Sequence, residues 1–89
     1  MARLIPAAER IRRARDLIRQ ARAVPVPAEG GRGDFSYIAN VKDLLRQARD
    51  LVKFIPKSPS ASEEMKTDVA QIYRESEEAE QELLHGKSA

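Results

Sequence analysis

A ten-residue pattern occurs twice in this chain, and it constrains the fold more than any other feature. Residues 9–18 read ERIRRARDLI, and residues 43–52 read DLLRQARDLV, 34 positions later. Five of the ten positions are identical: one arginine, Arg12 or Arg46, and the run Ala-Arg-Asp-Leu. Apolar residues in both copies recur at spacings of three and four, which places them on one side of an α-helix. We therefore expect two helices of similar design in an all-α protein.

The same spacing continues elsewhere in the chain and predicts three helices, at about residues 4–23, 35–55 and 60–84. Prolines and glycines predict a linker over residues 24–33, and residues 86–89 are expected to form a frayed tail after Gly86. A chain of 89 residues is typical of one domain. We predict a single helical domain over residues 1–89, built as a three-helix bundle or as a helical hairpin with a third helix.

Local signals predict where these helices begin and end. Asp34 or Ser36 can cap the second helix, and Pro56 should end it near residue 55. Ser60 followed by Glu63 has the spacing of a capping box, so the third helix is expected to begin there.

Each predicted helix carries one apolar seam. In chain order the seams are Leu4, Ala7, Ile11, Ala14, Ile18 and Ala21; Ile38, Val41, Leu45, Ala48, Val52 and Ile55; and Met65, Val69, Ile72, Ser76, Ala79 and Leu83. Half of the first seam is alanine, which permits close helix packing but buries little area. Ser76 interrupts the third seam, and its hydroxyl can donate to a carbonyl one turn earlier.

Charge changes sign along the chain. Residues 1–32 hold eight arginines against three acidic residues, a net charge of +5, whereas residues 58–89 hold three basic and eight acidic residues, a net charge of −5. Arg15 and Arg22 flank the first seam, and Asp68 and Glu82 flank the third, as does Glu75. We expect the basic and acidic helices to pair within the chain, which would fix the helix order more than it would add stability.

Nucleic-acid binding is the alternative interpretation of the basic helix, because guanidinium groups bind phosphate well. The arginines concerned are Arg10, Arg12, Arg13, Arg15, Arg19 and Arg22. Against this alternative, the chain has only four aromatic residues and no recognisable nucleic-acid-binding motif, and its acidic third helix would repel the polymer.

Several apolar residues of the central helix lie beside its seam, and a small bundle cannot cover all of them. These candidate partner-binding residues are Tyr37, Leu44, Leu51 and Phe54. Leftover apolar surface is typical of a binding site. The sequence therefore predicts a non-catalytic protein that associates with itself or with a protein partner, as a subunit of a scaffold, a virion or another multi-protein complex.

Signals for chemistry are few. Cysteine is absent and His85 is the only histidine, so we predict no enzyme, no cofactor, no metal site within one chain and no small-molecule substrate. Glu82 and His85 form one Glu-x-x-His pair, which leaves a metal site shared by several chains as a further alternative. No apolar run is long enough to span a membrane. We expect a cytoplasmic location, or one within a particle assembled inside the cell.

Overall fold

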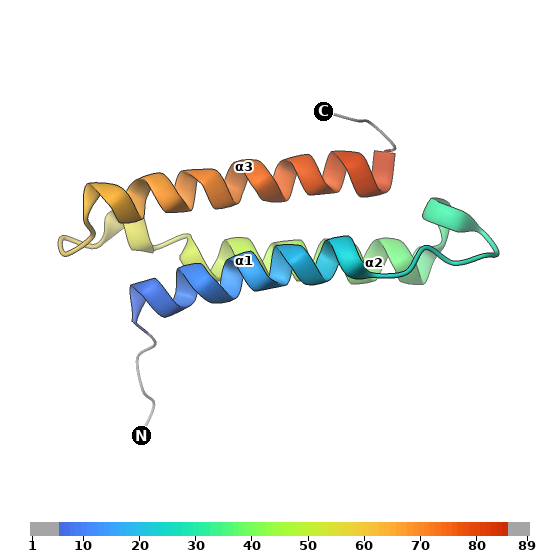
Figure 1. Cartoon of the computed structure of the whole chain (residues 1–89), viewed down its shortest axis with the longest axis horizontal. Helices are drawn as coiled ribbons and strands as arrows, with labels where there is room; N and C mark the ends of the chain where they lie inside the picture. The colour runs from blue at the N-terminus through green and yellow to red at the C-terminus, as the bar shows by residue number, and fades with distance from the viewer. Residues whose placement is uncertain (1–5, 86–89) are drawn as a thin grey trace, which may run out of the picture.

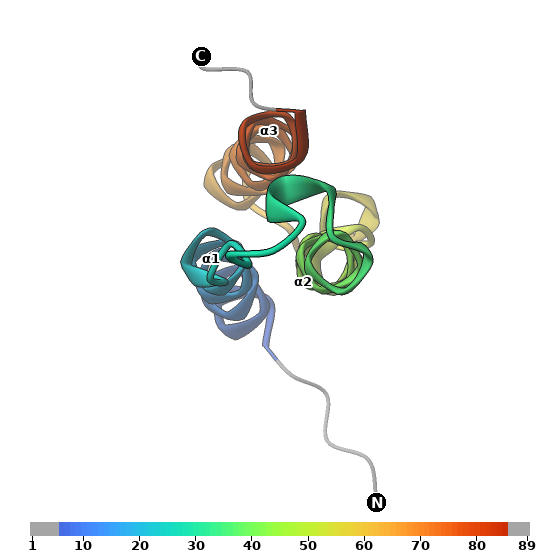
Figure 2. The ribbon, with the colours of Figure 1, turned by 90° about the vertical axis from the view of Figure 1, so that its right-hand side faces the viewer.

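The computed structural model describes residues 6–85, which form three α-helices joined by short connections and contain no strand (Figure 1). The helices are α1 (Ala7–Ala23), α2 (Phe35–Val52) and α3 (Glu63–His85), with 3₁₀ helices η1 (Gly31–Gly33) and η2 (Ile55–Lys57) in the connections. Neighbouring helices in the chain run in opposite directions, and α3 lies over one side of the α1–α2 pair (Figure 2). The predicted all-α, three-helix fold is confirmed. The predictions at residues 4, 5 and 86–89 lie outside the described residues.

The turn between α1 and α2 depends on two glycines. Gly30 and Gly31 have φ angles of 81° and 53°, a left-handed conformation that residues with a Cβ atom rarely adopt. Asp34 follows η1, and its Oδ1 atom accepts a hydrogen bond of 2.9 Å from the backbone N–H of Tyr37. Asp34 rather than Ser36 is therefore the N-terminal cap of α2.

The second helix ends three residues earlier than the predicted end near residue 55. A proline ring clashes with the carbonyl group four residues before it, so Pro56 disfavours α-helix from Val52 onward. The chain instead turns and forms η2, in which the missing N–H group of Pro56 is tolerated. Ile55 remains 6% exposed and still contributes to the core.

The third helix is capped at Ser62, not at Ser60 as the capping-box spacing predicted. The Ser62 hydroxyl accepts a 3.1 Å hydrogen bond from the N–H of Met65. Ser60 is engaged in a preceding turn, where its hydroxyl lies 3.0 Å from that of Ser58. The N–H of Ala61 donates to the carbonyl of Ser58 in the same turn, so the helix cannot begin before it.

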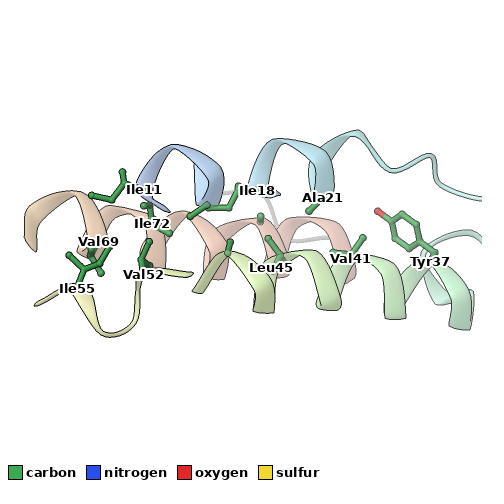
Figure 3. Packing of buried hydrophobic residues seen from close by; sticks show 13 residues of the cluster. Ile11, Ile18, Ala21, Tyr37, Val41, Leu45, Val52, Ile55, Val69 and Ile72 are labelled. Atoms are coloured by element: carbon green, nitrogen blue, oxygen red, sulfur yellow. The ribbon is translucent and has the colours of Figure 1, made fainter. Parts of the chain in front are cut away.

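The three seams meet in one core, except that Tyr37 is buried where Ile38 was predicted, and Ile38 is only partly buried (Figure 3). Its buried apolar residues are Ile11, Ala14, Ile18, Ala21, Tyr37, Val41, Leu45, Ala48, Val52, Ile55, Val69, Ile72 and Ala79. Ser76 is also buried, and its hydroxyl donates a 2.8 Å hydrogen bond to the carbonyl of Tyr73, as predicted. The hydroxyl is thereby satisfied inside an apolar core.

The two copies of the repeated pattern occupy equivalent places in the α1–α2 pair. Arg15 and Arg49, which correspond in the two copies, both reach side chains of α3. Leu17 and Leu51 come two positions after these arginines. Two residues of an α-helix turn through about 200°, so both leucines point away from α3. The antiparallel pair therefore has an approximate two-fold relation that presents arginines to one side and leucines to the other.

We expect overpacking at the α1–α2 contact to be costly. Ala48 is fully buried, whereas Ala39 lies on the exposed side of the same helix. Ala48→Leu should lower the free energy of unfolding by about 1–3 kcal/mol, and Ala39→Leu should change it by less than about 0.5 kcal/mol. Urea denaturation followed by circular dichroism measures both. Equal stability of the two variants would show that the alanine is not needed for close packing.

Candidate functional site

The side of the α1–α2 pair that faces α3 is closed by charged contacts. Arg15 donates from Nη2 to Asp68 at 3.1 Å and to the side-chain oxygen of Gln71 at 3.3 Å. Arg22 pairs with Glu82 near the other end of the same two helices. The predicted pairing of the basic first helix with the acidic third helix is therefore confirmed at these two arginines.

The second helix makes a similar contact to α3 through Arg49. Its Nη1 atom lies 3.3 Å from the hydroxyl of Ser76 and 3.9 Å from the Glu80 carboxylate. Arg49 thus binds the one buried polar side chain of the core among the described residues and a carboxylate beside it. Both helices of the pair therefore contact α3 through an arginine.

Three further arginines of α1, Arg12, Arg13 and Arg19, are engaged within their own helix. Arg12 and Arg13 both donate to Glu9, and these hydrogen bonds, with that from Arg12 the larger influence, lower the pKa of the Glu9 carboxyl. Arg19 pairs with Asp16 at 2.6 Å. Binding to phosphate would require these guanidinium groups to exchange a carboxylate partner. Nucleic-acid binding by this helix stays an untested alternative.

The opposite side of the pair carries an apolar strip that no described helix covers. Leu17 from α1 and Leu44 and Leu51 from α2 are half-buried and pack against the core. Leu17 and Leu51 line a shallow hollow together with Arg10, Gln47 and Asp50, and no residue of α3 takes part. We call Leu17, Leu44 and Leu51 the leucine face.

Two of the four predicted partner-binding residues belong to the leucine face, and the other two lie elsewhere. Phe54 is 60% exposed and borders a second hollow at the end of the bundle, beside Ser60 and Met65. The ammonium groups of Lys53 and Lys57 lie 5.1 and 5.8 Å from the centre of its ring. Such cation–π contacts partly shield the ring from water.

Tyr37 does not lie on a free surface, and its prediction as a partner-binding residue is wrong. The side chain is 2% exposed and packs in the core near the end of α1 (Figure 3). Its hydroxyl is buried and has no hydrogen-bond partner among the described residues. The first turn of α2 lies beside the last turn of α1. A side chain that flanks the seam in sequence is therefore buried at this position.

Leu17 is the residue of this face that the analysis of the sequence missed. It stands outside the first seam, between Ala14 and Ile18. The repeated pattern contains the signal that could have found it, because Leu17 corresponds to Leu51, one of the predicted partner-binding residues.

The described residues hold no cluster of three histidine, cysteine or acidic side chains that could bind a metal ion. Glu82, half of the predicted Glu-x-x-His pair, is held by Arg22, while His85 is exposed at the last turn of α3. A metal site shared by several chains stays an untested alternative.

Among residues 6–85, the helices are all too short or too polar to cross a membrane.

Comparisons of this chain with protein-family models, with curated proteins and with solved structures give no match.

We expect the Arg15–Asp68 contact to contribute a small but measurable coupling between α1 and α3. Asp68→Arg should lower the free energy of unfolding by about 1 kcal/mol, because a partly exposed pair is replaced by like charges. Adding Arg15→Asp should restore most of the loss. Glu77→Arg, at an exposed position of the same helix, is the matched control. A double-mutant cycle without coupling would contradict the pairing.

We also expect Glu9 to titrate below its ordinary pKa of 4.5, because the Arg12 and Arg13 guanidinium groups stabilise the carboxylate. Arg12→Gln combined with Arg13→Gln should raise the Glu9 pKa toward 4.5. The pairing favours folding above the ordinary pKa, and this contribution disappears as the pH falls through the lowered value. Side-chain NMR titration measures the change, with Arg46→Gln as the control. An unchanged Glu9 pKa would show that the pairs do not form in solution.

Proposed function

We propose that this chain is a non-catalytic helical subunit that assembles with a protein partner through its leucine face. The observation that carries the proposal is the contrast between the two sides of the α1–α2 pair. One side is covered by α3 and sealed by ion pairs, whereas the leucine face is uncovered by any described helix. Apolar surface that a small protein leaves open is typical of an interaction site.

Charge depletion on the second helix supports the proposal. Beside its buried seam, α2 carries a second stripe at spacings of three and four residues, and this stripe contains no charged side chain: Asn40, Leu44, Gln47 and Leu51. The whole chain is 34% charged, so four successive uncharged positions on one stripe stand out. Interface centres are depleted of charge in the same way.

The size of the chain favours the same role. A helical chain of 89 residues buries a modest fraction of its surface and has little stability to spare. A partner that covers the leucine face would add stability because it binds the folded state alone. The proposed function therefore requires rigid helices and an open face and involves no reaction.

Sedimentation of the fluorescently labelled chain in an extract of its native host tests this role. We expect the wild type to sediment in a complex larger than its own mass of 10.0 kDa. Leu44→Gln combined with Leu51→Gln should sediment at the monomer mass, since both changes remove apolar area from the face. Ala39→Gln combined with Ala70→Gln places the same residue at exposed positions away from the face and should behave as the wild type.

Circular dichroism must show that all these variants keep their helices. A wild type that sediments as a 10.0 kDa monomer in the extract would contradict the assembly role. A complex that the leucine-face variant retains would contradict the assignment of the site.

A further inference from the structure

We propose that a hollow at one end of the bundle binds an aliphatic carboxylate, a small anion with an apolar chain of the fatty-acid type. The hollow is separate from the uncovered surface of the leucine face, so this inference goes beyond the assembly role proposed above. Its basis is a lining that combines an apolar wall with basic and hydroxyl groups and contains no acidic side chain.

The hollow lies where α1 and α3 begin and α2 has just ended (Figure 1). The start of α1, the turns on both sides of η2 and the start of α3 all contribute to its lining, so its shape depends on the complete bundle. It has a volume of 360 Å³, which is in the range of sites for small molecules. We call it the end hollow.

One wall of the end hollow is apolar. It consists of Phe54, Ile55 and Met65 together with Ala7 and Ala61. The Phe54 ring is 60% exposed, so a ligand in the hollow would remove apolar surface from water. Methionine is unbranched and adapts to a flexible ligand. The volume equals that of about twelve water molecules, which suits an aliphatic chain of about eight carbon atoms.

The polar part of the lining consists of hydrogen-bond donors. Arg10 is half-buried in the wall, and a guanidinium group matches the geometry of a carboxylate. The hydroxyl oxygens of Ser58 and Ser60 lie 3.0 Å apart, and both residues line the hollow. A hydrogen bond between them uses one hydroxyl hydrogen, so the other hydroxyl can donate to a ligand.

Further positive charge lies beside the apolar wall. The ammonium groups of Lys53 and Lys57 are 5.1 and 5.8 Å from the centre of the Phe54 ring. Lys53 is also 3.6 Å from the Asp50 carboxylate, whereas Lys57 forms no ion pair within residues 6–85. The two acidic residues of the first turn of α3 are exposed and do not line the hollow. This distribution of charge favours an anion over a neutral ligand.

NMR titration of the isotope-labelled full chain with octanoate and with octanol tests the site. We expect octanoate to cause saturable shifts of the backbone amides of Ala61 and Met65. Octanol has the same chain without the charge, and it should bind about tenfold more weakly because charge-assisted hydrogen bonds are lost. Equal affinities for the two compounds would overturn the choice of an anion, and the absence of saturable shifts with octanoate would overturn the site.

Two variants separate the basic part of the lining from the apolar wall. Arg10→Gln should weaken octanoate binding by about tenfold and leave octanol binding unchanged. Phe54→Ala should weaken both by a similar factor, because both compounds have the same chain. Arg12→Gln is the matched control for charge, since its side chain is 67% exposed and does not line the hollow. A control as weak as Arg10→Gln would show a general effect of net charge and overturn the role of Arg10.

The leucine face needs its own control, because Arg10 also borders the hollow beside Leu51. Leu44→Gln combined with Leu51→Gln should bind octanoate as the wild type does. Octanoate binding that is lost in this variant and kept in Phe54→Ala would place the ligand on the leucine face and overturn the inference.

Circular dichroism must show that each variant keeps its helices. Should Arg10→Gln unfold, Lys57→Gln replaces it at an exposed position and should weaken octanoate binding alone. Loss of octanol binding to the same extent would overturn the role of charge. Failure of octanoate to bind leaves the assembly role standing, because sedimentation in the host extract tests that role without this ligand.

Discussion

Close antiparallel packing of α1 and α2 is the contact on which the rest of this protein depends. Ala14, Ala21 and Ala48 are fully buried there, and their small side chains permit the two helices to approach closely. This contact is the most extensive between helices in the described structure. Because the paired helices are similar in sequence, their packing also sets Arg15 and Arg49 on the same side of the pair.

The arginines explain why the two sides of the pair differ. An acidic helix can be held on the side where guanidinium groups point, and α3 carries the carboxylates of Asp68, Glu80 and Glu82 to them. The other side keeps its leucines, which no described helix covers. This contrast between one side covered by α3 and one open apolar side is the basis of the proposed assembly role.

Helix periodicity was sufficient to predict most of the core, because spacings of three and four residues select one side of a helix whatever lies next to it. Helix ends were harder to predict. Two serines compete to cap α3, and Ser62 is used because Ser60 takes part in the turn that brings Ala61 against the core. Pro56 acts on a carbonyl four residues away, so α2 ends at Val52 rather than next to the proline.

The sequence by itself determined three amphipathic helices, their seams and the opposite charges that bring α3 to the pair, because all of these follow from local spacing and composition. Only the tertiary structure decided which flanking residues are covered. Tyr37 and Leu51 both flank the seam of α2, yet the first lies in the core and the second borders the open face. Leu17 joins that face because α1 packs beside α2 there. Whether a flanking side chain is buried depends on where the neighbouring helices lie, and that is a long-range property that no local pattern contains.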